Sequence, residues 1–244
     1  GSMSRDEMLQ WMRNRCKGYT LPKLPLSVRK DHLPNAKLPR SSHYRIPSGL
    51  EEAVFYALQK QIDKGYMIEV EFDNSYWITQ GFAKVKPGRL QPGTSIPVVR
   101  ILGDFRPLNS ALDPIPAHWF HAQANQRVVC ESIPMGSTCF RYYDLSDAYH
   151  TMELDEDAQK LVVLQFNDRY FMYTGGAQGI APCAVFFNTH LQDGLYQIFG
   201  PHWESWYALM VDDIGVHAKS KESCKIRSDA LECALEVLGK PFSE

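Results

Sequence analysis

The chain has 244 residues, of which 44% are hydrophobic, and a formal net charge of -2 at pH 7. This length fits one large domain or two small ones with an apolar core, and the composition excludes a disordered or fibrous protein. The net charge argues against a protein that binds nucleic acid by bulk charge alone, although local basic segments can still contact phosphates.

The six cysteines lack the spacing of a zinc site and are too sparse for a disulfide scaffold, so we expect free thiols in an intracellular protein. Gly1-Ser2 before Met3 resembles a cloning scar. No apolar run is long enough for a signal peptide or a membrane span, which predicts a soluble protein without a membrane partner.

Residues 1–40 are predicted to form an N-terminal extension. Ser4 to Arg15 has the apolar spacing of a short helix with one face that must dock on another element. Residues 17–45 are rich in proline and basic side chains, with Asp31 as the only acid, which predicts an extended arm. A solvated arm and a phosphate-contacting arm are equally compatible with this composition.

Ser48-Gly49-Leu50-Glu51 is typical of a capping box, and the spacing that follows predicts a helix from Leu50 to Lys64-Gly65. Further helices are predicted at 117–128, 181–198 and 221–238. Strands are predicted at 66–72, 77–85, 96–105 and 138–143, a hairpin at 161–174, and a loop from 86 to 97. Irregular alternation with hairpins favours an α+β fold with an antiparallel sheet over a doubly wound parallel one.

Residues 206–218 form a β-rich apolar run that two adjacent acids, Asp212 and Asp213, interrupt. Two short strands joined by a tight hairpin fit this pattern, with the aspartates at its tip. Carboxylates beside a buried sheet are costly unless a cation compensates them, and no Lys or Arg lies between Arg169 and Lys219. A divalent cation and a solvent-exposed turn are the two alternatives.

Asp144 is a third carboxylate that also ends an apolar strand. A sheet that pairs the two strands would bring Asp144 to Asp212 and Asp213. Hard oxygen ligands in an incomplete shell suit Mg²⁺, and two such ions promote in-line phosphoryl transfer. The three acids therefore predict a magnesium site.

Several ordered blocks surround these acids: Lys86-Pro87-Gly88, Arg100 to Asn109, Asp144 to His150, Gln178-Gly179 with Ala181-Pro182, and Met210 to Asp213. Together they resemble the fingers and palm of a reverse transcriptase (RNA-directed DNA polymerase), closest to the retroviral and gypsy-type long-terminal-repeat retrotransposon group, from Tyr44 to Glu244. The resemblance implies fingers at 41–112 and 152–180 and a palm at 113–151 and 181–244. The implied architecture is a polymerase right hand whose antiparallel palm sheet is backed by helices, with the thumb absent.

By this resemblance Asp144, Asp212 and Asp213 would be catalytic, and two Mg²⁺ ions, with Mn²⁺ as an alternative, would be held by Asp144, Asp212 and the carbonyl of Leu145. Met210 stands where the family usually has a tyrosine that contacts the primer end. Residues implied in nucleotide binding are Lys86, Arg100, Leu145, Asp147, Ala148, Tyr149 and Gln178.

Among these, Lys86 and Arg100 would grip the triphosphate, and Tyr149 would be an aromatic gate that excludes a ribose 2′-hydroxyl. A core tyrosine is the alternative for Tyr149. The Gln178 loop is two residues shorter than usual before Pro182, so this assignment can shift along the chain. Asp104, Arg106 and Asn109 are expected to be structural.

The resemblance implies an RNA-directed DNA polymerase core of a retroelement polyprotein. Its partners would be an RNA or DNA template with a primer and deoxynucleoside triphosphates. The chain ends at Glu244, where the family continues into a thumb, so we expect a piece with a weak grip on duplex. Its location would be the cytoplasm, with the nucleus or a virus-like particle as alternatives. A domesticated scaffold that binds nucleic acid or protein is the second hypothesis, and an RNA-templated RNA polymerase is the third.

Overall fold

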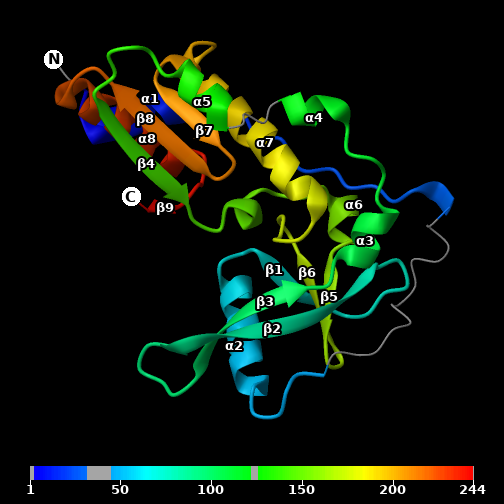
Figure 1. The fold of residues 1–244 in the computed structure, drawn as a ribbon. Coiled ribbons are helices and arrows are strands. Elements are labelled where there is room, and N and C mark those ends of the chain that lie inside the picture. Colours follow the sequence, from blue (N-terminus) through cyan, green and yellow to red (C-terminus); the bar gives the residue numbers. More distant parts are fainter. Residues whose placement is uncertain (1–2, 32–44, 122–125, 244) are drawn as a thin grey trace. The chain divides into compact units, whose positions relative to one another are not determined.

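The computed structural model describes residues 3–31, 45–121 and 126–243 (Figure 1). These residues form eight α-helices: α1 (Arg5–Arg15), α2 (Glu51–Asp63), α3 (Arg106–Ala111), α4 (Ala117–His121), α5 (Gln126–Ser132), α6 (Glu156–Gln159), α7 (Ala181–Phe199) and α8 (Lys221–Val237). The strands are β1 (Met67–Val70), β2 (Ile78–Leu90), β3 (Pro97–Gly103), β4 (Cys139–Leu145), β5 (Val163–Phe166), β6 (Arg169–Tyr173), β7 (Tyr207–Met210), β8 (Asp213–Ala218) and β9 (Phe242–Ser243). Short 3-10 helices are η2 (Ala148–Thr151) and η3 (Trp203–Ser205).

The chain divides into two compact units, and each unit contains one sheet. The first unit comprises Gly1–Lys23, Ile115–Met152 and Ala184–Glu244. The second unit comprises Leu24–Pro114 and Glu153–Cys183. The fold is therefore α+β, as the sequence predicts.

The sheet of the first unit has the order β7-β8-β4-β9, and all its pairs are antiparallel, as expected. Side chains alternate between its faces, as pleating requires. Tyr143 and Ile214 are fully buried, and α8 packs against β4 and β8. The opposite face exposes Phe140 and Tyr142, so one face of this sheet carries the core and the other carries aromatic surface.

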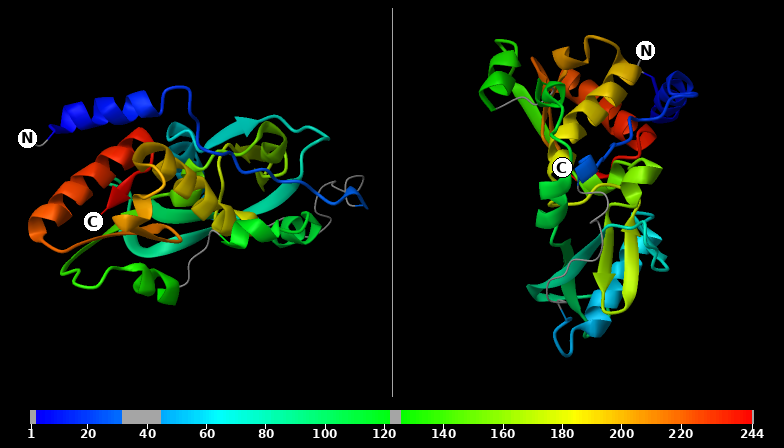
Figure 2. Two further views of the ribbon diagram at one scale, coloured as in Figure 1. Left: turned by 90° about the horizontal axis from the view of Figure 1, so that it is seen from above. Right: turned by 90° about the vertical axis from the view of Figure 1, so that its right-hand side faces the viewer.

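The predicted N-terminal helix is confirmed as α1. Ser4 forms a capping box with Glu7, which satisfies backbone N–H groups at the start of the helix. Leu9 and Met12 are buried, and α1 packs along α8 (Figure 2). Arg5 of α1 pairs with Glu236 at 3.0 Å. The helix therefore belongs to the core of the first unit.

The sheet of the second unit has the order β1-β6-β5-β2-β3 and is mixed, because β2 and β5 pair in parallel. The predicted antiparallel sheet is therefore present in the first unit, whereas the sheet of the second unit also contains a parallel pair. Gly81 on β2 permits close packing, since a Cβ there would lie 2.2 Å from Phe166. Helix α2 packs against β1 and β3.

Several local predictions differ from the structure. The prediction of a capping box at Ser48 is wrong, because α2 begins after Leu50 without a side-chain cap. The predicted stop at Gly65 is confirmed, since Gly65 follows the helix with a φ of 79°. Strand β2 continues through Pro87-Gly88 to Leu90, where a loop was expected. The predicted helix at 117–128 is two helices, α4 and α5, and α3, α6 and β9 were not predicted.

The described part of the basic arm has local contacts. In the second unit, Leu24 bridges Leu154 and Val28 bridges Leu112, and both Leu24 and Val28 are buried. The expected arm therefore packs on the protein at these positions. Its residues 32–44 lie outside the described part.

All six cysteines are free thiols, as predicted. Burial raises the pKa of Cys183 to about 12, so this thiol stays protonated at neutral pH. Within residues 3–31, 45–121 and 126–243, no helix is long and apolar enough to cross a bilayer.

Candidate functional site

The acidic turn lies at the end of the β7–β8 hairpin in the first unit. Met210 pairs with Asp213 across the two strands, so the turn consists of Val211 and Asp212. The prediction of a tight hairpin is confirmed, but only Asp212 is at its tip, and Asp213 is the first residue of β8. Val211 has a φ of 55°, which is strained for a β-branched side chain and is a kind of strain that clusters at functional sites.

Strand β4 brings Asp144 to this turn. The antiparallel register places Asp144 directly opposite Asp213, and the N–H of Leu145 donates to the carbonyl of Asp212 at 3.0 Å. The expected pairing of these two strands is thus confirmed. On its other side β4 pairs with β9, so Asp144 and Leu145 lie on a strand that is flanked on both sides.

Electrostatics couple the three acids. The pKa of Asp213 is raised, first by burial, then by the charges of Asp212 and Asp144, and by a side-chain hydrogen bond with Asp144. Two carboxylates can share a hydrogen bond only if one of them carries the proton. A cation that replaced this proton would relieve the same repulsion.

The donor set fits a hard divalent cation, since carboxylate oxygens are the ligands that Mg²⁺ prefers. Within the described ranges, however, no three His, Cys, Asp or Glu side chains are placed so as to hold one metal ion. An ion at Asp144 and its neighbours would have to complete its shell with water, backbone carbonyls or phosphate oxygens, which Mg²⁺ commonly does.

The chain turns sharply after β4. Asp147 is exposed and has a φ of 52°, and its carbonyl accepts from the N–H of Thr151 at 3.1 Å, which closes η2. Ala148 is buried under this turn. Tyr149 is half-buried and packs edge-to-face on Phe187 of α7, with 5.8 Å between ring centroids. The tyrosine ring is thus partly exposed and partly held by a core aromatic.

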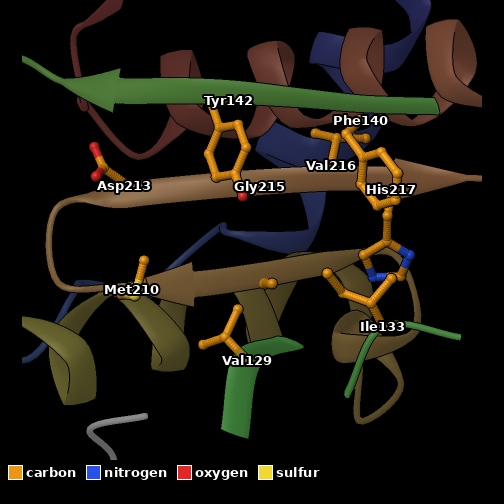
Figure 3. A pocket seen from close by; sticks show the side chains of 10 residues that line it. Val129, Ile133, Phe140, Tyr142, Met210, Asp213, Gly215, Val216 and His217 are labelled. Atoms are coloured by element: carbon orange, nitrogen blue, oxygen red, sulfur yellow. The ribbon is translucent and has the colours of Figure 1, made fainter. Parts of the chain in front are cut away.

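A pocket lies on the aromatic face of this sheet. Figure 3 shows Met210 and Asp213 at its turn end and His217 at the opposite end. It is lined by Val129, Ile133, Phe140, Tyr142, Ala208, Met210, Asp213, Gly215, Val216 and His217. Met210 therefore borders both the acids and an apolar surface.

His217, which no sequence motif indicates, has an unusual environment. Its ring is buried, neither nitrogen has a hydrogen-bond partner, and burial and the charge of Arg227 lower its pKa. The imidazole is therefore neutral at physiological pH. The sequence signal for His217 is the two-residue alternation of β8, which places it on the same face of the sheet as Asp213 and Gly215.

In the second unit, Arg100 and Lys86 lie on the β2–β3 hairpin. Arg100 is exposed and Lys86 is half-buried. The register places Lys84, which was not predicted as a site residue, directly opposite Arg100. Like charges at opposed positions destabilise a sheet, so this pair favours a bound anion.

Gln178 also belongs to the second unit, in an exposed loop before α7. Asn109 fixes this loop, because its amide donates to the carbonyl of Gly179 at 2.8 Å and accepts from the N–H of Ala181 at 3.0 Å. Arg106 pairs with Asp104 through two hydrogen bonds of 2.7 and 2.8 Å. Asp104, Arg106 and Asn109, which were expected to be structural, thus each form local hydrogen bonds.

The structure brings the acids, η2 and Met210 together in the first unit, while Lys86, Arg100 and Gln178 belong to the second. Comparison with known proteins adds no family: no protein-family model and no curated protein matches the chain.

Proposed function

We propose that the chain is an RNA-directed DNA polymerase core, which transfers nucleotides from deoxynucleoside triphosphates to a primer 3′-hydroxyl. The observation that carries this proposal is the pairing of Asp144 with Asp213 beside Asp212, at a strained turn where the strands of an antiparallel sheet end. Together with the ordered sequence blocks, this acidic turn is better explained by phosphoryl transfer than by fold maintenance, because three adjacent carboxylates destabilise a fold.

Each group has a role in this reaction. Asp144, Asp212 and the carbonyl of Leu145 would hold Mg²⁺, and Asp213 would complete the acidic cluster. Bound Mg²⁺ would supply charge neutralisation for the triphosphate and acidify the primer hydroxyl. Lys86 and Arg100, joined by Lys84, supply positive charge for phosphate oxygens. By the sequence resemblance, Tyr149 would exclude a ribose 2′-hydroxyl, and Gln178 of the second unit would be a nucleotide-binding residue.

A scaffold that binds nucleic acid or protein without catalysis is the alternative. One observation favours it: the described side chains form no ready three-ligand metal group. The presence of Met210 in place of a tyrosine also fits a chain that has lost a primer contact. Such a scaffold needs the basic hairpin but not the acids.

Primer extension on an RNA template with Mg²⁺, at saturating primer–template, separates these functions. The polymerase proposal predicts extension by the wild-type chain and a loss of at least about a hundredfold in Asp212→Asn. Asp168→Asn, which removes an exposed carboxylate of the second unit, is the matched control and should retain activity.

Two other outcomes would contradict the polymerase proposal, and the second requires that duplex binding is measured as well. Equal extension by wild type and Asp212→Asn would remove Asp212 from the mechanism. A wild-type chain that binds primer–template equally with and without Mg²⁺, but extends nothing, would support the scaffold instead.

A further inference from the structure

Lys240 of the first unit is a buried cation, with a relative exposure of 3%. Its ammonium donates to the carbonyl of Thr151 at 3.1 Å and to the Thr151 hydroxyl at 3.0 Å. It also lies 2.7 Å from Nε2 of His190. Burying an ammonium is costly unless it is well hydrogen-bonded. The three acceptors around Lys240 match the three N–H donors of its ammonium.

The protonation state of His190 follows from its second partner. Nδ1 lies 2.7 Å from the carbonyl of Pro22, which can only accept, so Nδ1 carries the hydrogen. Nε2 therefore has a free lone pair and accepts from Lys240. Burial, and then the charge of Lys240, lower the pKa of His190 to about 3, so the ring stays neutral. Pro22 thus fixes the tautomer that Lys240 needs.

Lys240 contacts two groups that hold Tyr149 in place, Thr151 of η2 and the ring of Phe187. Thr151 is the last residue of η2, and its hydroxyl donates to the carbonyl of Ala148 at 2.7 Å, so the ammonium fastens the turn that carries Tyr149. The ammonium also lies 5.8 Å from the ring centroid of Phe187, the ring on which Tyr149 packs. One side chain therefore contacts both the turn that carries Tyr149 and the ring on which Tyr149 packs.

We propose that Lys240 is a positioning residue that sets the place of Tyr149 and hence the preference for deoxynucleotides, an inference that rests on the proposed function. An apolar side chain would fill a buried position without the desolvation cost of an ammonium, which is often the more stable choice. The cation is explained if the fixed geometry of η2 is needed. Through Pro22 and His190, the N-terminal segment takes part in the same support.

Lys240→Met tests the proposal, with Lys225→Met as the matched control because Lys225 lies on the exposed face of α8. Amide hydrogen exchange at Thr151 and Met152, whose N–H groups close η2, should accelerate about tenfold or more in Lys240→Met only. The ratio of kcat/KM for deoxynucleotide over ribonucleotide should fall about tenfold or more, since small misplacements of a positioned group have effects of this size.

His190 provides a second pair of variants. His190→Gln keeps one donor for Pro22 and one acceptor for Lys240 and should retain the selectivity ratio, whereas His190→Leu should lower it as Lys240→Met does. If Lys240→Met does not fold, this pair carries the test.

Unchanged exchange rates, or faster exchange with an unchanged selectivity ratio, would overturn the positioning role while leaving the polymerase proposal intact. A wild-type chain that incorporates no deoxynucleotide would overturn the proposed function itself. The two failures are therefore distinguishable.

Discussion

Ionisation of Asp213 accounts for part of the free energy by which the acidic turn destabilises the fold. Its pKa in the folded protein is raised from the ordinary value of 3.8, because burial and the charges of Asp212 and Asp144 oppose its ionisation. A raised folded pKa means that its contribution to stability is complete below the ordinary value and is lost as the pH rises through the folded pKa. The ionised turn therefore destabilises the apo protein at neutral pH.

Asp213→Asn should raise the free energy of unfolding at neutral pH by about 0.5 kcal/mol, a figure that allows for solvent screening at this half-buried group. It should also flatten the decline in stability above pH 3.8. Urea denaturation across this pH range measures both effects, and Mg²⁺ should stabilise wild type more than the variant.

Glu204→Gln, an exposed acid of the same unit, serves as the control and should leave the pH dependence unchanged. A pH profile for Asp213→Asn that overlays the wild-type profile would contradict the coupling of the three acids.

The residue that faces Asp144 could not be predicted from the sequence. Strand and turn propensities located the hairpin, but a shift of one residue in register exchanges the side chains of Asp212 and Asp213 between positions. Register depends on packing against α8 and on pairing with β4, which local patterns do not encode. The sequence therefore predicted the set of acids but not the Asp144–Asp213 pair.

Elements differ in how far the sequence predicts them. Helices α1, α7 and α8 are long and periodic, and all three were predicted within two residues. Strand β9 and the parallel β2–β5 pair form only through partners distant in the chain, and α3 and α6 are too short for periodicity to indicate. Pairing with β3 likewise carries β2 past Pro87, where turn composition indicated a loop.

The β2–β3 hairpin gives a prediction at this scale, because Lys84 opposes Arg100. Lys84→Gln should raise the free energy of unfolding by a few tenths of a kcal/mol, since it removes a like-charge pair. The same change should weaken binding of a deoxynucleoside triphosphate about tenfold, the scale of one lost hydrogen bond to a charged group. Urea denaturation and titration calorimetry measure the two effects.

Lys160→Gln changes another exposed cation of the second unit and should affect triphosphate binding little. Equal binding by Lys84→Gln and wild type would show that the hairpin does not recognise phosphate through this side chain.

For the molecule as a whole, a net charge of -2 means that attraction to a polyanion must come from local surfaces. The β2–β3 hairpin holds such a surface, with cations at Lys84, Lys86, Arg89 and Arg100. Each phosphate that a cation neutralises releases a counterion, so the salt dependence of binding counts these contacts. The number of contacts separates local recognition from binding by bulk charge.

In the absence of a deoxynucleoside triphosphate, which would otherwise occupy Lys86 and Arg100, binding of a primer–template duplex should therefore show a slope of log K against log salt of about -3 to -4, as four cations predict. Arg100→Gln should make the slope shallower by about 1, and Lys225→Gln on α8 should leave it unchanged. Fluorescence anisotropy during a potassium chloride titration measures the slope. A slope near -10, or a slope that Arg100→Gln does not alter, would place the duplex on another surface, because the hairpin has too few cations to release that many ions.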